Sequence, residues 1–270
     1  MQHDTSQSLT EIDSDRDYYG GLANWMDTVA WYDDSHILQR VDELVPRHTT
    51  SCLELCCGTG RLGVYLAQRH RFVEHSLWDA SQEMIRRAAE HARERNVLIK
   101  IRRGNWNEAL HSVLPYDVVI VKNSLHVIDN LHDSLRLLSA RSDSRTRLIV
   151  VETVSPTSEA REFISHLSNA LGISAVKKRV FDSASLSLAL LEAGWHELSG
   201  SQHLCQWIDV GDWMRHKAVS DLHLLAARKV FDRASSEVAT AMQFQGAVSS
   251  EGVPEQMLRL QFIGVFMLGA

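Results

Sequence analysis

Short apolar runs alternate with amphipathic stretches over most of the chain. In the stretch 84–92 the apolar positions recur at the spacing of one helical face, and 131–138 and 163–171 repeat that spacing. The segments 116–121 and 147–152 are apolar runs of strand length. Such an alternation predicts an α/β fold with a doubly wound, mostly parallel sheet.

The run LELCCGTGRLG, from Leu53 to Gly63, holds the most informative residues. A strand pattern that contains the acid Glu54 opens into Gly58 and Gly60 and then continues as a helix. The two glycines lack the β-carbons that would keep a ligand away from the backbone, and the helix directs its unpaired N–H groups toward that ligand. This arrangement predicts a nucleotide-type cofactor site.

The glycine spacing alone leaves two classes of cofactor open. Gly58, Gly60 and Gly63 satisfy the dinucleotide fingerprint, and Asp79 lies near the offset of roughly 20 residues at which an acid holds a ribose. A nicotinamide-dependent oxidoreductase is therefore one alternative. The sequence shows no Tyr-x-x-x-Lys pair or other hydride-transfer arrangement to accompany it.

The residues around the glycines resemble the class I S-adenosylmethionine-dependent methyltransferases. The family's first motif, acid-x-G-x-G-x-G, is matched from Glu54 to Gly60, with Cys56 in place of the first glycine. Its second motif, D-x-S-x-x-M, is matched from Asp79 to Met84. Segments 116–126, 147–152 and 190–195 also resemble the family's later elements, so the similarity covers approximately residues 50 to 210.

The resemblance implies S-adenosylmethionine as the cofactor and assigns roles to the matching residues. Glu54 would orient the methionine amino end, Gly58 and Gly60 would contact the cofactor through their backbone, and Asp79 would accept both ribose hydroxyls. The residues expected to bind the cofactor are Glu54, Cys56, Gly58, Gly60, Asp79, Ala80, Asn105, Trp106 and Asn123.

The adenine end departs from the family pattern. The family reads the adenine amino group with an acid, which is replaced here by Asn105, whose amide oxygen can accept the same hydrogen bond. Trp106 would cover the adenine face, and packing in the core is its alternative role.

The resemblance further implies a Rossmann-like sheet whose last strand, near 258–267, is antiparallel. We expect one domain made of an N-terminal helical lid over 1–46, a cofactor-binding core over 50–206, and a helical cap with the last strand over 207–270. The lid contains Trp25 and Trp31, which either cover the cofactor or pack the helix onto the sheet. In the cap, the spacing of Leu222, Leu225, Ala226 and Val230 predicts a packed helix face.

Methyl transfer needs alignment of the reacting atoms and, for a protonated acceptor, a base. His126, which follows the fourth strand, is the expected base, and a hydrogen bond to the chain is its alternative role. Tyr18 and Tyr19 are expected to face the sulfonium as aromatic groups near a cation. Every motif named so far recognises the cofactor. A cyclase that releases methylthioadenosine and uses the same side chains, or a non-catalytic adenosyl-binding protein, therefore stays open.

Charge and composition narrow the partners. With 28 basic and 34 acidic residues, the formal net charge is −6, which disfavours a nucleic-acid substrate. No apolar run is long enough for a membrane span, and the four cysteines and fourteen histidines show no spacing typical of a metal site. We expect a cytoplasmic enzyme of secondary metabolism that acts on a small, largely apolar acceptor; its oligomeric state is open.

Overall fold

The computed structural model describes residues 18–29, 34–112, 115–174, 179–246 and 253–269. Two compact units divide the chain: the first contains residues 1–121 and 140–148, and the second contains residues 122–139 and 149–270. Trp31, which was expected in the N-terminal lid, lies outside the described residues.

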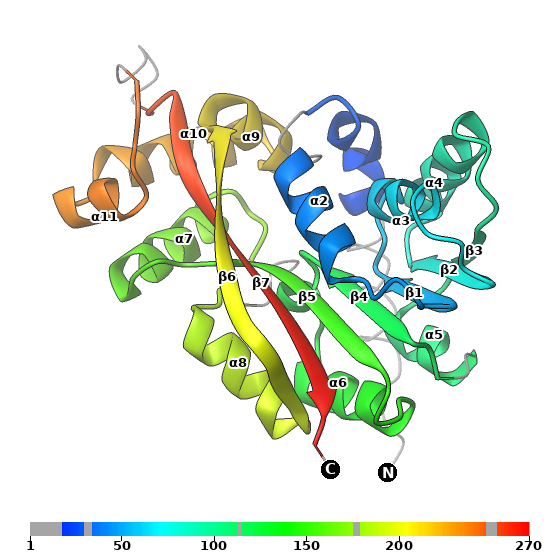
Figure 1. Ribbon diagram of the computed structural model, residues 1–270. Helices are drawn as coiled ribbons and strands as arrows, with labels where there is room; N and C mark the ends of the chain where they lie inside the picture. Colours follow the sequence, from blue (N-terminus) through cyan, green and yellow to red (C-terminus); the bar gives the residue numbers. More distant parts are fainter. Residues whose placement is uncertain (1–17, 30–33, 113–114, 175–178, 247–252, 270) are drawn as a thin grey trace, which may run out of the picture. The chain divides into compact units, whose positions relative to one another are not determined.

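The strands form one seven-stranded sheet in the order β3-β2-β1-β4-β5-β7-β6. They are β1 (Ser51–Leu55), β2 (Glu74–Asp79), β3 (Lys100–Arg103), β4 (Val118–Lys122), β5 (Arg147–Val154), β6 (Trp195–Asp209) and β7 (Gln256–Leu268). In the first unit, β1 pairs in parallel with both β2 and β4, and β2 pairs in parallel with β3. In the second unit, β7 runs antiparallel to β6 along its length (Figure 1). The predicted fold class, including the antiparallel last strand, is confirmed.

Helices occupy the segments between the strands. They are α2 (Ser35–Leu44), α3 (Arg61–Ala67), α4 (Gln82–Glu94), α5 (Trp106–Ser112), α6 (Leu131–Ala140), α7 (Ser158–Ala170), α8 (Ser183–Glu192), α9 (Val210–Lys217), α10 (Asp221–Asp232) and α11 (Ser236–Ala241), with a 3-10 turn η2 (Leu125–Val127) and a helix over 18–26. The helices predicted at 84–92, 131–138 and 163–171 are α4, α6 and α7. Polar side chains cap the starts of two of them: Ser81 accepts a hydrogen bond from the Met84 N–H before α4, and Thr157 accepts one from the Ala160 N–H before α7.

The prediction for the cap helix α10 was wrong about its buried face. Leu222 and Leu225 are 75% and 52% exposed, whereas Ala227 and Phe231 are buried. The ring of Phe231 lies 5.2 Å from that of Phe163 on α7, edge to face. Apolar residues lie on more than one side of α10, and the aromatic pair, which buries the larger area, determines which side packs.

The core of the first unit brings the glycine loop close to the sheet. A β-carbon on Gly63 in α3 would lie 2.4 Å from Cδ2 of Leu77 and 2.8 Å from Oε2 of Glu54. Only a glycine permits this approach, because real β-carbons do not come so near to other heavy atoms. Helix α3 is therefore held directly against β1 and β2, and its first turn faces the carboxyl ends of these strands.

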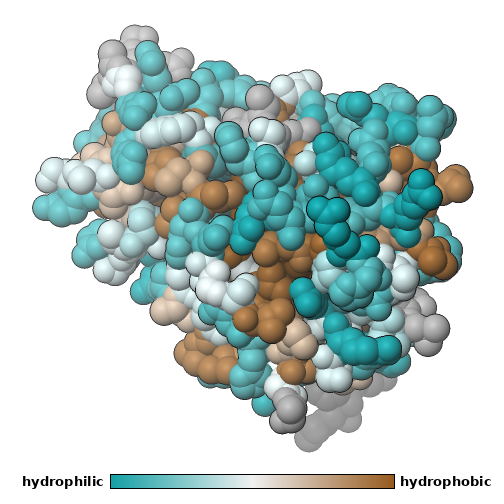
Figure 2. All heavy atoms as spheres, viewed as in Figure 1, coloured by the Kyte–Doolittle hydropathy of each residue, from teal (hydrophilic) through white to brown (hydrophobic). Residues whose placement is uncertain are grey.

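Much of the surface is polar. The face drawn in Figure 2 is mainly hydrophilic with smaller apolar areas, as the charged fraction of 23% suggests. Among the described residues, every helix is too short or too polar to cross a bilayer.

Candidate active site

Every second residue of the loop from Cys56 to Gly60 has a left-handed backbone conformation. Cys56, Gly58 and Gly60 have φ values of 53°, 57° and 73°, and Gly60 is the N-cap of α3. Cys56 occupies a left-handed position at which the family motif has glycine, and this conformation destabilises a residue with a side chain by roughly 1–2 kcal/mol. The replacement of the motif's first glycine by Cys56 therefore adds local backbone strain but leaves the turn unchanged.

Asp79 links this loop to the next helix. Its Oδ2 accepts a hydrogen bond from the Gly58 N–H at 2.8 Å, and its Oδ1 accepts one from the Ser81 N–H at 2.9 Å. Burial raises the pKa of Asp79, and these backbone donors partly oppose that rise. Each carboxylate oxygen keeps further acceptor capacity, so the two bonds are compatible with the ribose role that the sequence predicts for Asp79.

Glu54 and Ala80, two other residues of the predicted cofactor site, also lie in the first unit. Glu54 lies in β1 with 2% of its surface exposed, and β1 pairs directly with the strand that ends at Asp79. Ala80 is half-buried, and its carbonyl accepts a hydrogen bond from Nε of Arg103 at 3.2 Å. The structure thus brings Glu54, the glycine loop and Asp79 to one edge of the sheet.

Asn105 has a structural use that the sequence reasoning missed. Its Oδ1 accepts from the Glu108 N–H at 2.9 Å, while its own N–H donates to Oε2 of Glu108 at 2.7 Å. This reciprocal pair is the arrangement of a capping box at the start of α5. Trp106 is 5% exposed, which favours the packing alternative for its ring. Adenine recognition by either residue stays a prediction.

Tyr18 and Tyr19 lie in the first turn of the 18–26 helix. Their ring centroids are 5.3 Å apart in an edge-to-face arrangement, and both side chains are half-buried. Trp25 in the same helix is 8% exposed, as its packing alternative requires. The proximity of either tyrosine to a sulfonium stays a prediction.

In the second unit, His126 is held by a buried carboxylate. Its Nδ1 lies 2.9 Å from Oε1 of Glu152, whose side chain has no exposed surface. Glu152 also accepts hydrogen bonds from the Leu125 N–H at 2.8 Å and the Thr153 N–H at 2.9 Å. Burial alone would raise the pKa of Glu152, but His126 and the backbone donor lower it below its usual value.

Arg179 holds the other side of the turn that carries His126. Its guanidinium donates to the Leu125 carbonyl at 2.8 Å, to the Asp129 carbonyl at 3.0 Å and to the Ile128 carbonyl. Its backbone N–H donates to the His126 carbonyl at 3.2 Å. Glu152 and Arg179 together fix both the N–H and C=O groups of η2 and so restrict where the imidazole can lie.

Asn123 begins a chain of polar side chains within the second unit. It has a left-handed φ of 52°, which asparagine tolerates well, and its Oδ1 accepts from Oγ1 of Thr153 at 3.2 Å. Gln261 on β7 has no exposed surface. With its amide oriented to satisfy both neighbours, Gln261 donates to Oδ1 of Asn123 at 3.0 Å and accepts from Nε of Arg259 at 2.8 Å. A role for Asn123 toward the cofactor stays a prediction.

Residues 52–140, which include the glycine loop, Asp79, Asn105 and His126, match the model of the methyltransferase domain family. The chain therefore contains a segment that matches a methyltransferase domain. The match agrees with the family and the transferase class that the motifs indicate, and it includes the residues expected to bind S-adenosylmethionine. No curated protein sequence matches the chain significantly.

Solved structures share the fold of this chain at low sequence identity. YcgJ of Bacillus subtilis is 15% identical with a TM-score of 0.72, and the match covers 87% of this chain and 99% of that chain. A putative methyltransferase of Bacillus halodurans C-125 is 12% identical with a TM-score of 0.73, over 87% and 98% of the two chains. A Thiobacillus denitrificans methyltransferase in complex with S-adenosyl-L-homocysteine is 13% identical with a TM-score of 0.51, over 86% and 90%.

Glu152, to which the sequence motifs assign no role, could have been found from the sequence. Glu152 is an acid near the end of the apolar strand β5, just as Glu54 is in β1. A charged residue in a run of buried apolar positions requires a partner, and His126 is that partner. Arg179 carries no such signal, because it follows a segment without helical or strand pattern.

Two arginines of α4, Arg86 and Arg87, are paired with acids of the same unit. Arg86 contacts Glu83 and Glu90 on its own helix, and Arg87 contacts Asp27 and Glu90. Each acid offsets the charge that a phosphate backbone would otherwise attract. The charges of these two arginines are thus offset by neighbouring acids.

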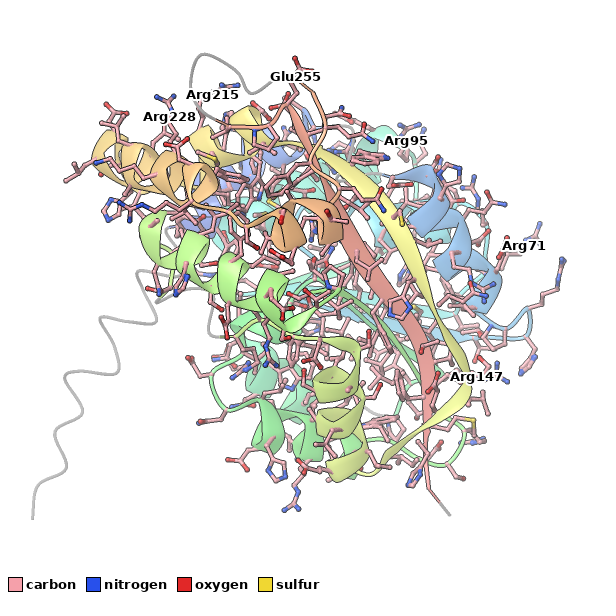
Figure 3. The ribbon with its side chains drawn as sticks, turned by 90° about the vertical axis from the view of Figure 1, so that its left-hand side faces the viewer. Arg71, Arg95, Arg147, Arg215, Arg228 and Glu255 are labelled. Atoms are coloured by element: carbon pink, nitrogen blue, oxygen red, sulfur yellow. The ribbon has the colours of Figure 1, made fainter. Side chains whose placement is uncertain are left out.

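Other basic side chains stand apart along the chain. Arg71 precedes β2, Arg95 follows α4, and Arg215 lies on α9; all three are exposed, and they are labelled in Figure 3.

Proposed function

We propose that this methyltransferase transfers the methyl group of S-adenosylmethionine to a small, largely apolar acceptor in secondary metabolism, and that His126 removes the acceptor's proton. The observation that supports the base most directly is the contact between His126 and Glu152. A base of this kind accelerates proton transfer by about 10² to 10⁴-fold in enzymes.

The carboxylate defines the tautomer of the imidazole. Because an ionised carboxylate only accepts hydrogen bonds, the Nδ1 atom 2.9 Å from Glu152 must carry a proton. In the neutral ring the basic lone pair then lies on Nε2, which is the nitrogen that takes the acceptor's proton. The lowered pKa of Glu152 keeps its carboxylate ionised near neutral pH, so the orientation persists under working conditions.

The order of the strands supports a position of His126 near the methyl group that is transferred. Strands β1 and β4 are parallel neighbours, so their carboxyl ends meet the same edge of the sheet. The glycine loop follows β1 directly, and His126 follows β4 by four residues along the chain. In open α/β sheets, ligands bind at this carboxyl edge.

The acceptor class rests on charge and on the cap. The net charge of −6 and the paired arginines of α4 disfavour a nucleic acid as acceptor. Phe231 and Phe244 of the cap form a ring cluster with Phe163 of α7, with centroids 5.2 to 5.8 Å apart. A cap with an apolar interior suits an apolar acceptor. The four cysteines form no disulfide in the described part of the chain, which agrees with a cytoplasmic location.

The test is to incubate the purified protein with S-adenosylmethionine labelled on its methyl group, with and without a panel of small phenols, amines and thiols. Products are identified by liquid chromatography and mass spectrometry. The proposal expects S-adenosylhomocysteine together with a labelled acceptor, and a His126→Gln variant that binds cofactor and turns over slowly.

Two other outcomes would contradict the proposal. Methylthioadenosine with a cyclised amino acid, formed without any acceptor, would identify the cyclase alternative. Tight cofactor binding with no consumption across the panel would contradict the acceptor class that we propose.

A further inference from the structure

A buried ion cluster lies at the end of the 18–26 helix, among residues that no motif includes. The Asp27 side chain is 7% exposed, and Arg87 of α4 contacts its Oδ2 with Nε at 2.6 Å and Nη2 at 2.5 Å. The Nε2 atom of His91, one turn further along α4, lies 3.3 Å from the same oxygen. A carboxylate so far removed from water is stable only while its charged partners remain in place.

The same residues reach the glycine loop of the cofactor site. The Nδ1 atom of His91 lies 2.9 Å from the Thr59 carbonyl oxygen, so its imidazole connects Asp27 to the loop. Nη1 of Arg61, the first residue of α3, donates to the Met26 carbonyl at 3.2 Å. The Met26 methyl lies 4.0 Å from where a β-carbon on Gly58 would be.

Met26 thus lies beside Gly58, and Asp27 reaches the Thr59 carbonyl through His91. Asp79 connects Gly58 to the start of α4, and Asp27 connects the 18–26 helix to the middle of the same helix. The N-terminal helix, the loop and α4 form one ring of contacts, in which each member restricts the other two.

We propose that Asp27 is a positioning residue for the cofactor: its ion pair with Arg87 and its contact with His91 dock the 18–26 helix onto the glycine loop, and docking and S-adenosylmethionine binding strengthen each other. This inference rests on the cofactor assignment and goes beyond it, because it gives a role to a residue outside the motifs that bind the cofactor. Coupling of this kind is reciprocal: the factor by which docking strengthens cofactor binding equals the factor by which bound cofactor strengthens docking.

The test compares Asp27→Asn with a control on α4, the helix that carries Arg87. Arg86→Gln removes an arginine that pairs with Glu83 and Glu90 of its own helix and leaves Asp27, Arg87 and His91 in place. Affinity for S-adenosylhomocysteine is measured by titration calorimetry. Hydrogen exchange of the 18–26 amides is measured with and without that ligand, and thermal unfolding controls for a general loss of stability.

We expect S-adenosylhomocysteine to slow exchange in the 18–26 helix of the unchanged protein and of Arg86→Gln. In Asp27→Asn we expect about ten-fold weaker binding and loss of the ligand-dependent protection of this helix. Adding Arg87→Gln to Asp27→Asn should weaken binding little further, since both changes remove one interaction. Wild-type affinity and wild-type protection in Asp27→Asn would overturn the proposal.

A second variant covers the case in which Asp27→Asn folds poorly. Arg87→Lys keeps the charge but loses the two-pronged contact with Asp27, and it must show the same paired loss of affinity and protection. If the unchanged protein itself fails to bind S-adenosylhomocysteine, the cofactor assignment falls and the docking proposal with it. Unaltered binding in the variants overturns the docking proposal alone.

Discussion

Nδ1 of His126 lies 2.9 Å from Oε1 of Glu152, a carboxylate with no exposed surface. The pair joins the loop after β4 to the end of β5. Glu152 also accepts hydrogen bonds from two backbone N–H groups. A substitution that removes its charge but keeps its shape therefore separates its effect on His126 from its effect on the backbone.

Glu152→Gln tests the charge. The amide retains acceptor capacity on one oxygen only, so we expect kcat to fall by about ten-fold or more with little change in cofactor affinity. His126→Gln should lower kcat further, and the double variant should be no slower than His126→Gln alone. His216→Gln, at an exposed histidine of α9, is the control. Independent, additive losses in the double variant would argue against a His126–Glu152 unit.

Asp79→Asn should weaken binding of S-adenosylhomocysteine by about ten-fold or more, as loss of charge-assisted hydrogen bonds to the ribose implies. The matched control is Asp117→Asn. Asp117 also accepts backbone N–H groups, from Thr50 and Ser51, but it lies at the amino end of β4. Titration calorimetry should show unchanged affinity for the control, and equal losses in both variants would mean that Asp79 acts through stability alone.

Gly63→Ala should destabilise the protein by roughly 1–3 kcal/mol, because the new methyl group would collide with Leu77 and Glu54. Gly21→Ala is the counterpart, since a β-carbon there meets nothing within 4 Å. As that glycine is helical, alanine should stabilise it by up to about 1 kcal/mol. Urea unfolding of the two variants checks the signs, and a neutral Gly63→Ala would contradict the close packing of α3.

His75 predicts a loss of stability in mild acid. It is 5% exposed in β2, and neither ring nitrogen has a hydrogen-bond partner among the described residues. Burial, with a smaller effect of His70, lowers the pKa of His75 to about 4. Between that value and the unfolded value near 6.5, the unfolded state binds more protons, so stability falls as the pH falls.

The shift corresponds to about 3 kcal/mol of stability, present above pH 6.5 and lost by pH 4. Chemical unfolding of the protein at pH 7 and pH 5 measures most of this difference. His75→Leu removes the titrating group and should flatten the profile over that range, while a His216→Gln control should keep it. An unchanged slope in His75→Leu would exclude His75 as the cause.

Local patterns predicted the elements well. The spacing of apolar residues located α4, α6 and α7, and Gly172, which has a left-handed φ of 77°, ends α7 as glycine does after many helices. The glycine loop and the motif that begins at Asp79 could be recognised from the sequence because each consists of residues close together in the chain. The face of α10 was not, because Leu222 and Phe231 compete for the same role and only α7 decides between them.

Pairings between distant segments stayed hidden for a physical reason. His126 and Glu152 are 26 positions apart, Arg179 and Leu125 are 54 apart, and Asp27 and Arg87 are 60 apart. Which charged residue meets which depends on strand order and helix rotation, and neither is encoded within a few residues of any partner. The sequence indicates that a buried acid needs a charged or polar partner, but which residue is that partner depends on the three-dimensional fold.

The place of β7 in the sheet affects how the chain is synthesised. It lies between β5 and β6 although it follows both in the sequence, and it pairs with β6 from Asp209 to Trp195. Until residues 256–268 leave the ribosome, β5 and β6 each have an open edge that can pair with another nascent chain. The yield of soluble protein should therefore depend on how quickly this late strand is made, more than on any residue of the cofactor site.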